Sequence, residues 1–203
     1  MLGIPDFALT ADTRLCRELR QLGIVTFSQL ATKVRILDYG RTANQIDPLA
    51  VLQEGRGTCS SKHLLLALAA HDCSRHEVHL AVGIYLMAEA NTPGVGAVLA
   101  SHAVDSIPEA HCYLIAGQER HDFTGLASGL ASPFAALLEE HEVVPARLTE
   151  SKARLHSRAL EHWAASTEIS LARAWTIREA CIFALAKQPQ PNLPAASVTG
   201  GPA

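Results

Sequence analysis

Apolar side chains follow a helical period in the first part of the chain. The first predicted helix presents its apolar face at three leucines, Leu15, Leu19 and Leu22. Asp12 would cap its start, and Gly23 would allow the left-handed turn that often ends a helix. A second helix is predicted from Thr26 to about residue 37, because Thr26 and Gln29 have the spacing of a capping box. Both helices are expected to serve as packing elements.

The most densely apolar helix is predicted to begin at Cys59. Residues 38–57 are polar and rich in turn residues, and Gly55 and Gly57 end this stretch. A run of Leu and Ala at 64–70 follows and favours a buried helix. The thiol would then lie at the positive end of the helix, which favours the thiolate. Cys59 is therefore a candidate nucleophile, although many free cysteines are simply core residues.

The period changes to two after about residue 77, which indicates a sheet. Strict alternation at 78–87 predicts a long strand with one buried face, and 97–104 could form a second strand. Residues 107–116 and 120–124 are predicted to form a hairpin with a turn at 117–118. The chain therefore combines helices and a sheet, in the α+β class.

The turn at 117–118 would place His111 and Asp122 on one face of the hairpin. In that register they are diagonal neighbours, so the carboxylate could accept a hydrogen bond from one imidazole nitrogen. The other nitrogen could then take a proton from a thiol. A loop of different parity would bring His121 to that face instead, and His102 is the best rival base.

The end of the chain is predicted to be helical. A helix starts at Pro133 and ends before Pro145, and 148–187 is helical almost throughout, with Ser166 or Thr167 capping a new helix within it. We expect residues 1–145 to form a core, 146–187 a helical extension packed on it, and 188–203, rich in Pro, Ala and Gly, a flexible tail.

Composition excludes several classes of protein. A chain of 203 residues, 48% hydrophobic and 18% charged, can bury a full core. The net charge of -3 and the scattered basic residues predict no nucleic-acid partner, and no apolar run is long enough for a membrane span. The five cysteines include no C-x-x-C pair, which favours a reducing, cytoplasmic compartment.

The ten histidines do not indicate a metal site. His71, His76 and His79 are close in sequence but lack the spacing of a zinc helix, so we expect no metal and no cofactor. Lys62 and His63 lie one turn beyond the nucleophile and could tune its pKa. We expect both to be solvated or bonded locally. Cys112 is expected to be a core residue that points away from His111.

The order of these motifs resembles the transglutaminase-like branch of the papain-like thiol enzymes. The residues that carry the resemblance are Gly57-Thr58-Cys59, Glu109-Ala110-His111-Cys112-Tyr113 and Arg120-His121-Asp122. The resemblance covers about residues 40–125. It implies an α+β papain/transglutaminase-like core with a nucleophilic Cys59, a general-base His111 and an orienting Asp122. The sequence has no long acidic loop of the kind that binds calcium, so calcium activation is not expected.

The resemblance implies a cysteine-dependent amide hydrolase or acyltransferase that acts through a thioester. Its substrate would be a peptide, a protein side-chain amide or a small amide. Backbone N–H groups near Thr58 and the amides of Asn44 and Gln45 are candidates to bind the oxyanion, although polar loop side chains more often bond to their own backbone. A catalytically inactive module that binds a peptide or protein is the alternative, and a metal-binding protein a weaker third. The sequence does not indicate an oligomeric state.

Overall fold

The computed structural model describes residues 3–127 and 129–188, which form an α+β fold around a four-stranded antiparallel sheet. The order of the strands across the sheet is β5-β4-β3-β6. Their bounds are Val78–Met87 for β3, Ile107–Ala116 for β4, Glu119–His121 for β5 and Leu137–Glu142 for β6. Helix α4 (Cys59–Asp72) packs against β3 and β4. The predicted α+β class is therefore confirmed.

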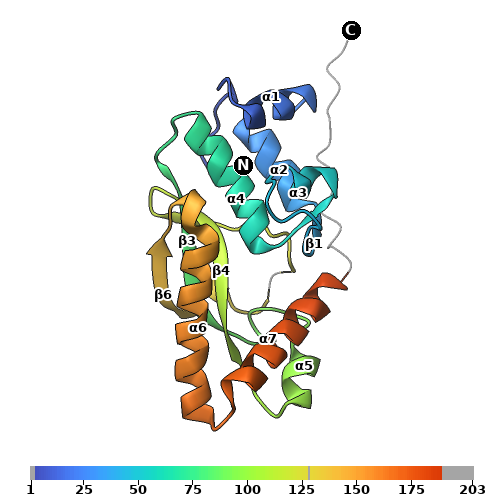
Figure 1. Cartoon of the computed structure of the whole chain (residues 1–203), viewed down its shortest axis with the longest axis vertical. Helices are drawn as coiled ribbons and strands as arrows, with labels where there is room; N and C mark the ends of the chain where they lie inside the picture. Colours follow the sequence, from blue (N-terminus) through green and yellow to red (C-terminus); the bar gives the residue numbers. More distant parts are fainter. Residues whose placement is uncertain (1–2, 128, 189–203) are drawn as a thin grey trace.

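The N-terminal helices surround α4 at one end of the molecule (Figure 1). They are α1 (Arg14–Gln21), α2 (Phe27–Arg35) and the short α3 (Ala50–Gln53). Strands β1 (Asp38–Tyr39) and β2 (Arg56–Gly57) pair in parallel just before α4. The capping box of Thr26 and Gln29 is present as predicted.

Two details of α1 differ from the prediction. Thr13 caps the helix, because its hydroxyl accepts the N–H of Cys16 at 3.2 Å. Asp12 pairs instead with Arg17 at the surface. Leu22, expected on the apolar face, is 60% exposed because the helix has already ended at Gln21.

The two central strands of the sheet, β3 and β4, are buried on both faces. On β3, Leu80, Val82 and Ile84 join the core cluster that contains the N-terminal helices and α4. Tyr85 and Met87 belong to a second cluster built with α7 (Leu171–Ala186) and the end of α6 (Leu148–Thr167). Because both faces are covered, the polar groups that remain on the sheet are enclosed and need partners.

The segment predicted as a second strand is the helix α5 (Gly96–Ser101). Its start is fixed by Glu89, whose carboxylate accepts the N–H groups of Gly94 and Gly96 at 2.9 and 2.6 Å. Val95 and Leu99 are buried one helical turn apart against α7. This packing, together with the helix-forming alanines, decides the conformation against a strand.

The helix predicted from Pro133 is also wrong. A single 3-10 turn, η1 (Pro133–Ala136), leads into strand β6, and a second turn, η2 (Pro145–Arg147), leads into α6. Residues 137–142 pair with the free edge of β3, where Ile84 faces Glu139. Since an unpaired strand edge leaves N–H and C=O groups without partners, this pairing outweighs the helix propensity of Leu and Glu.

The C-terminal helices α6 and α7 pack on the sheet and on each other. The break between them lies at Glu168, which is left-handed with φ of 57°, and Ser170 caps α7. The hydroxyls of Ser166 and Thr167 bond back to Trp163 inside α6, so the predicted caps are wrong. The predicted tail lies outside the described residues beyond position 188. Within the described ranges, no helix combines the length and the apolar character needed to cross a membrane.

Candidate active site

Cys59 is the first residue of α4, as predicted. Thr58 caps the helix: its Oγ1 accepts the N–H of Ser61, and the Ser61 hydroxyl accepts the N–H of Thr58 at 2.9 Å. A Cβ atom on Gly57 would lie 2.8 Å from the Lys62 side chain and 3.0 Å from the Ser61 hydroxyl. The Gly-Thr-Cys sequence therefore lets the loop pass close to the helix and fixes the thiol at its N-terminus.

Thr58→Ala should lower the free energy of unfolding by about 1 kcal/mol, the usual cost of losing an N-cap. Thr26→Ala is the matched control, because Thr26 caps α2 with the same reciprocal bonds away from the thiol. Urea denaturation should show similar losses for both variants. Only Thr58→Ala should change the rate of Cys59 alkylation; equal rates in the two variants would contradict the local role of this cap.

The hairpin has the predicted register and brings His111 to Asp122. Ala116 pairs with Glu119 across the two-residue turn. His111 Nε2 lies 2.9 Å from Asp122 Oδ2, while Asp122 Oδ1 accepts the N–H of Thr124 at 2.8 Å. The carboxylate is thus fixed on both oxygens. The carboxylate is hydrogen-bonded to Nε2 of the imidazole, so Nδ1 remains available for another partner.

Cys59 and His111 form a charged pair. A hydrogen bond with Cys112 lowers the pKa of the Cys59 thiol, burial opposes this, and Lys152 and a hydrogen bond with His111 lower the pKa further, to well below its ordinary value. Burial would lower the pKa of His111, but the Asp122 carboxylate and Cys59 raise it to about 10. Burial would likewise raise the pKa of Asp122, and the imidazolium holds it well below its usual range. These opposite shifts favour a thiolate–imidazolium pair.

Two residues of α4 tie the nucleophile to the segment that carries Asp122. His63 Nε2 accepts the N–H of Phe123 at 2.8 Å, so the proton is on Nδ1, which donates to the Cys59 carbonyl at 2.8 Å. Burial lowers the pKa of His63 to about 4 and keeps the ring neutral. The expectation of a local bond is correct for His63, but the side chain is buried.

Lys62 contradicts the sequence prediction. Its side chain is completely buried, and its Nζ donates to the carbonyls of Leu37 at 2.5 Å and Thr124 at 2.7 Å. Burial lowers the pKa of this amine to about 8. The bonds are neither local nor solvated, because the side chain crosses from α4 to two distant loops. Lys62 and His63 together hold the thiol and the Asp122 loop in a fixed relation.

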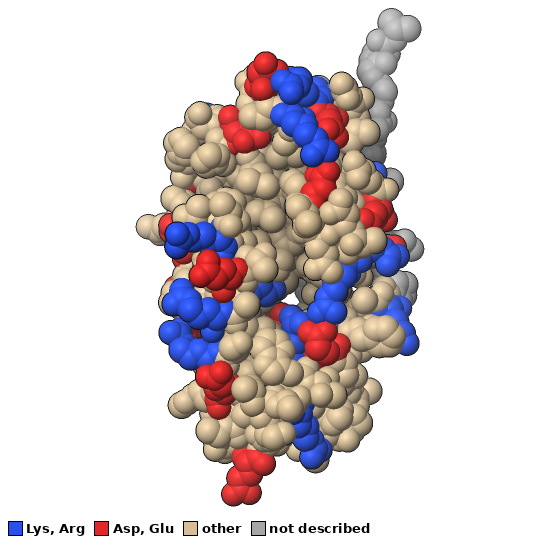
Figure 2. Space-filling model, viewed as in Figure 1, with Lys and Arg blue, Asp and Glu red and all other residues tan. Residues whose placement is uncertain are grey.

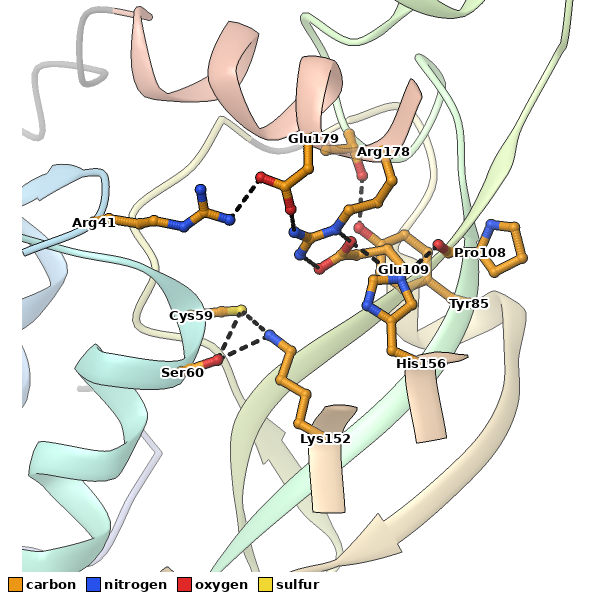
Figure 3. A network of polar contacts seen from close by, with 11 residues as sticks. Arg41, Cys59, Ser60, Tyr85, Pro108, Glu109, Lys152, His156, Arg178 and Glu179 are labelled. Atoms are coloured by element: carbon orange, nitrogen blue, oxygen red, sulfur yellow. Dashed lines mark hydrogen bonds and ion pairs between the residues drawn. The ribbon is translucent and has the colours of Figure 1, made fainter. Parts of the chain in front are cut away.

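Lys152 and Ser60 contact the thiol, and sequence reasoning missed both (Figure 3). Lys152 extends from α6, and its Nζ lies 3.3 Å from Cys59 Sγ and 2.8 Å from Ser60 Oγ. Ser60 Oγ is also 3.4 Å from the sulfur of Cys112. Cys112 is buried as predicted, but it lies beside the nucleophile, where the proximity of Cys59 raises its pKa.

A buried ion pair joins α7 to β4 next to the thiol. Arg178 donates to both carboxylate oxygens of Glu109, at 2.7 and 2.8 Å, and also to Glu179 at 2.6 Å. Glu179 accepts a further bond from Arg41 at 2.7 Å. His156 lies beside this pair and bonds to the carbonyl of Pro108 at 3.0 Å. This network holds the last helix over the site (Figure 3).

Two cavities flank the Cys–His pair. One of about 300 Å³ is lined by Cys59 and Lys152, and one of about 280 Å³ by His111 and Asp122. Tyr39 lines both. Figure 2 shows the surface hollowed at the middle of the molecule, with Lys and Arg side chains around the hollow. A substrate in these cavities would lie between the nucleophile and its base.

The three residues predicted to bind the oxyanion all line the first cavity, but their side chains differ in their hydrogen bonds. Asn44 Oδ1 accepts the N–H groups of Ile46 and Asp47 at 3.0 and 3.1 Å, so its carbonyl serves its own loop. Thr58 uses its hydroxyl for the cap. Gln45 is exposed at the rim. The N–H of Cys59 belongs to the first turn of α4 and has no acceptor within the helix, so it is available to an oxyanion.

The two alternative histidines considered from the sequence, His102 and His121, do not enter the site. His102 follows α5 and His121 pairs opposite Leu114 on β5, and both lie outside the linings of the two cavities. Among residues 3–127 and 129–188, no group of three His, Cys, Asp or Glu side chains is placed to hold a metal ion. Comparisons of the chain with protein-family models, curated proteins and solved structures found no match. Any function must therefore be inferred from the geometry of the site itself.

Proposed function

We propose that this protein is a cysteine-dependent amide hydrolase or acyltransferase with the triad Cys59, His111 and Asp122. One observation carries the proposal: a thiol at a helix N-terminus interacts electrostatically with an imidazole, and a half-buried carboxylate 2.9 Å away orients that imidazole. The resemblance of the three motifs to transglutaminase-like thiol enzymes supports the same chemistry, and with it a papain/transglutaminase-like core.

The reaction begins with attack of the Cys59 thiolate on an amide carbonyl. The S–C bond forms, and the N–H groups at the start of α4 stabilise the oxyanion. The intermediate collapses to a thioester when the C–N bond breaks and the amine leaves with the proton of His111. His111 then takes a proton from water or from a second amine, which attacks the thioester and releases the thiolate. Water gives hydrolysis, and an amine gives acyl transfer.

The pH dependence of Cys59 alkylation by iodoacetamide tests this proposal. In the unaltered chain, Cys59 should react well below the pKa of about 8.5 of a free thiol. In His111→Ala its apparent pKa should rise, and its rate at pH 6 should fall by about a hundredfold, which corresponds to two pH units of thiolate population. Mass spectrometry of proteolytic peptides measures Cys59 separately from the other cysteines.

His79→Ala is the control, because His79 is exposed and pairs with Glu142 at the far edge of β3. The His79→Ala variant should leave the pH dependence of Cys59 alkylation unchanged. An ordinary thiol titration in both the unaltered chain and His111→Ala would refute the proposal.

The low exposure of the nucleophile favours one alternative. Cys59 is only 2% exposed, and Lys152 contacts its sulfur. An inactive module that binds a peptide or protein in the same cavities would also have an enclosed thiol. If the protein is such a module, the thiol should have ordinary reactivity, and the Cys59→Ser variant should still bind the ligand. The alkylation profile separates the two functions.

A further inference from the structure

The ammonium group of Lys152 reaches the nucleophile from a separate helix. It lies 3.3 Å from Cys59 Sγ, inside the cavity where an acyl group would bind (Figure 3). The triad mechanism uses the helix N-terminus and His111, so it does not require this third positive group. A role of Lys152 in substrate binding would explain its position.

The carboxylates around this cavity are already paired. Glu109 has both oxygens bonded to Arg178, and Glu179 is shared by Arg178 and Arg41. Asp47, on the cavity wall, bonds to Arg14. Within the described part of the chain, the anion that Lys152 contacts is the Cys59 thiolate.

Acylation removes that anion. When the thiolate becomes a thioester, the sulfur loses its charge. Lys152 is then left in a half-buried cavity with the Ser60 hydroxyl at 2.8 Å and the attraction of Glu109, a carboxylate already paired with Arg178. The positive charge that remains is costly unless a new anion approaches it. A carboxylate on the acyl group would restore the balance at the step where the charge is lost, and would form a charge-assisted hydrogen bond with Nζ.

We infer that Lys152 selects acyl donors that carry a carboxylate close to the scissile carbonyl. This inference rests on the proposed function and specifies its substrate class as anionic amides, such as peptides or small amides with an acidic group beside the reacting bond. Lys152 is then a specificity residue that contacts substrate. The amines that leave or enter are not constrained by it.

Iodoacetate and iodoacetamide test the inference directly. Both have nearly the same size, and in both the thiolate forms an S–C bond and displaces iodide; they differ in charge. Since both react with the same thiolate, the ratio of their rates cancels any change in thiolate population. At Cys59 this ratio should exceed the ratio for N-acetylcysteine by about tenfold, as one charge interaction at intermediate dielectric predicts.

Lys152→Met should return the ratio to that of N-acetylcysteine, and Lys152→Arg should keep it high. Arg154→Met is the matched control, because Arg154 is exposed on α6 and lies outside the linings of both cavities. It should leave the ratio unchanged. Lys152→Gln replaces the Met variant if that variant does not fold, because it also removes the cation and should also lose the preference for iodoacetate.

The outcomes separate the inference from the proposed function. A low thiol pKa combined with a ratio equal to that of N-acetylcysteine would overturn the substrate class and leave the triad in place. A high ratio that survives in Lys152→Met would also overturn it, because His111 would then supply the attraction. An ordinary thiol titration would instead overturn the function, and the inference with it.

Discussion

Replacing Arg178 by Met should lower the free energy of unfolding by about 3–5 kcal/mol, which is the usual cost of leaving one member of a buried ion pair without its partner. Glu109 is 3% exposed, and both of its oxygens bond to Arg178. In the variant its carboxylate would remain inside the protein without this compensation. Urea denaturation monitored by circular dichroism would measure the loss.

Two further variants separate charge from packing in this prediction. Arg173→Met changes an exposed arginine on the same helix and should alter stability by less than about 0.5 kcal/mol. The double variant Glu109→Gln with Arg178→Met should be more stable than Arg178→Met alone, because it removes the stranded charge. A double variant as unstable as the sum of its parts would show that the two residues do not act as a pair.

Cys59→Ser should make stability fall as the pH rises above 6.5, by about 1.4 kcal/mol for each pH unit. The pKa of His111 is raised from 6.5 to about 10 in the folded protein, so its stabilisation is complete below pH 6.5 and is lost as the pH rises. The folded pKa of Cys59 is below its ordinary value of 9.0, so its contribution grows with pH in the same range. In the unaltered protein the two slopes therefore oppose each other up to about pH 9.

Because Cys59→Ser has no thiol, only the contribution of His111 to the pH dependence of the free energy of unfolding remains. In this variant the fall in stability should stop below pH 10, because part of the rise in the His111 pKa is due to the Cys59 thiolate. Cys73→Ser is the control, since the free thiol of Cys73 lies 3.9 Å from the sulfur of Cys16, at the opposite end of α4 from Cys59. Free energies of unfolding measured from pH 6.5 to 8.5 should be parallel in Cys73→Ser and the unaltered chain. A slope in Cys59→Ser equal to theirs would mean that His111 is not charged in the folded state.

The position of Cys59 at a helix start and the pairing of His111 with Asp122 could be predicted because each depends on local rules. The cap at Thr58 and the glycines before it place Cys59, and a two-residue turn fixes the register that brings Asp122 to His111. Capping and turn parity act over a few residues, so a single sequence contains the information. The catalytic roles of the three residues stay predictions until the thiol is titrated.

The errors lie where distant partners decide the local conformation. Residues 137–142 have helix-forming side chains, yet the open edge of β3 draws them into a strand. The segment that begins at Gly96 alternates weakly, yet the Glu89 carboxylate and the face of α7 hold it as a helix. Neither the edge nor the carboxylate is visible within the segment that responds to it.

Lys152, Lys62 and Arg178 could not be recognised from the sequence for a related reason. Each is a basic residue on a predicted helix, and such residues usually point to solvent. Their partners are separated from them by 93, 62 and 69 positions, at Cys59, Thr124 and Glu109. A pattern within one helix carries no sign of such pairings.

The order of the site residues along the chain has a consequence for biosynthesis. Cys59, His111 and Asp122 are all translated before Lys152 and Arg178, which lie on α6 and α7. A nascent chain on the ribosome therefore carries Cys59 before the ammonium group that pairs with it and before the helix that closes its cavity. The surroundings of Cys59 are completed only after α6 and α7 have been translated, so chains that stop before these helices lack the assembled site.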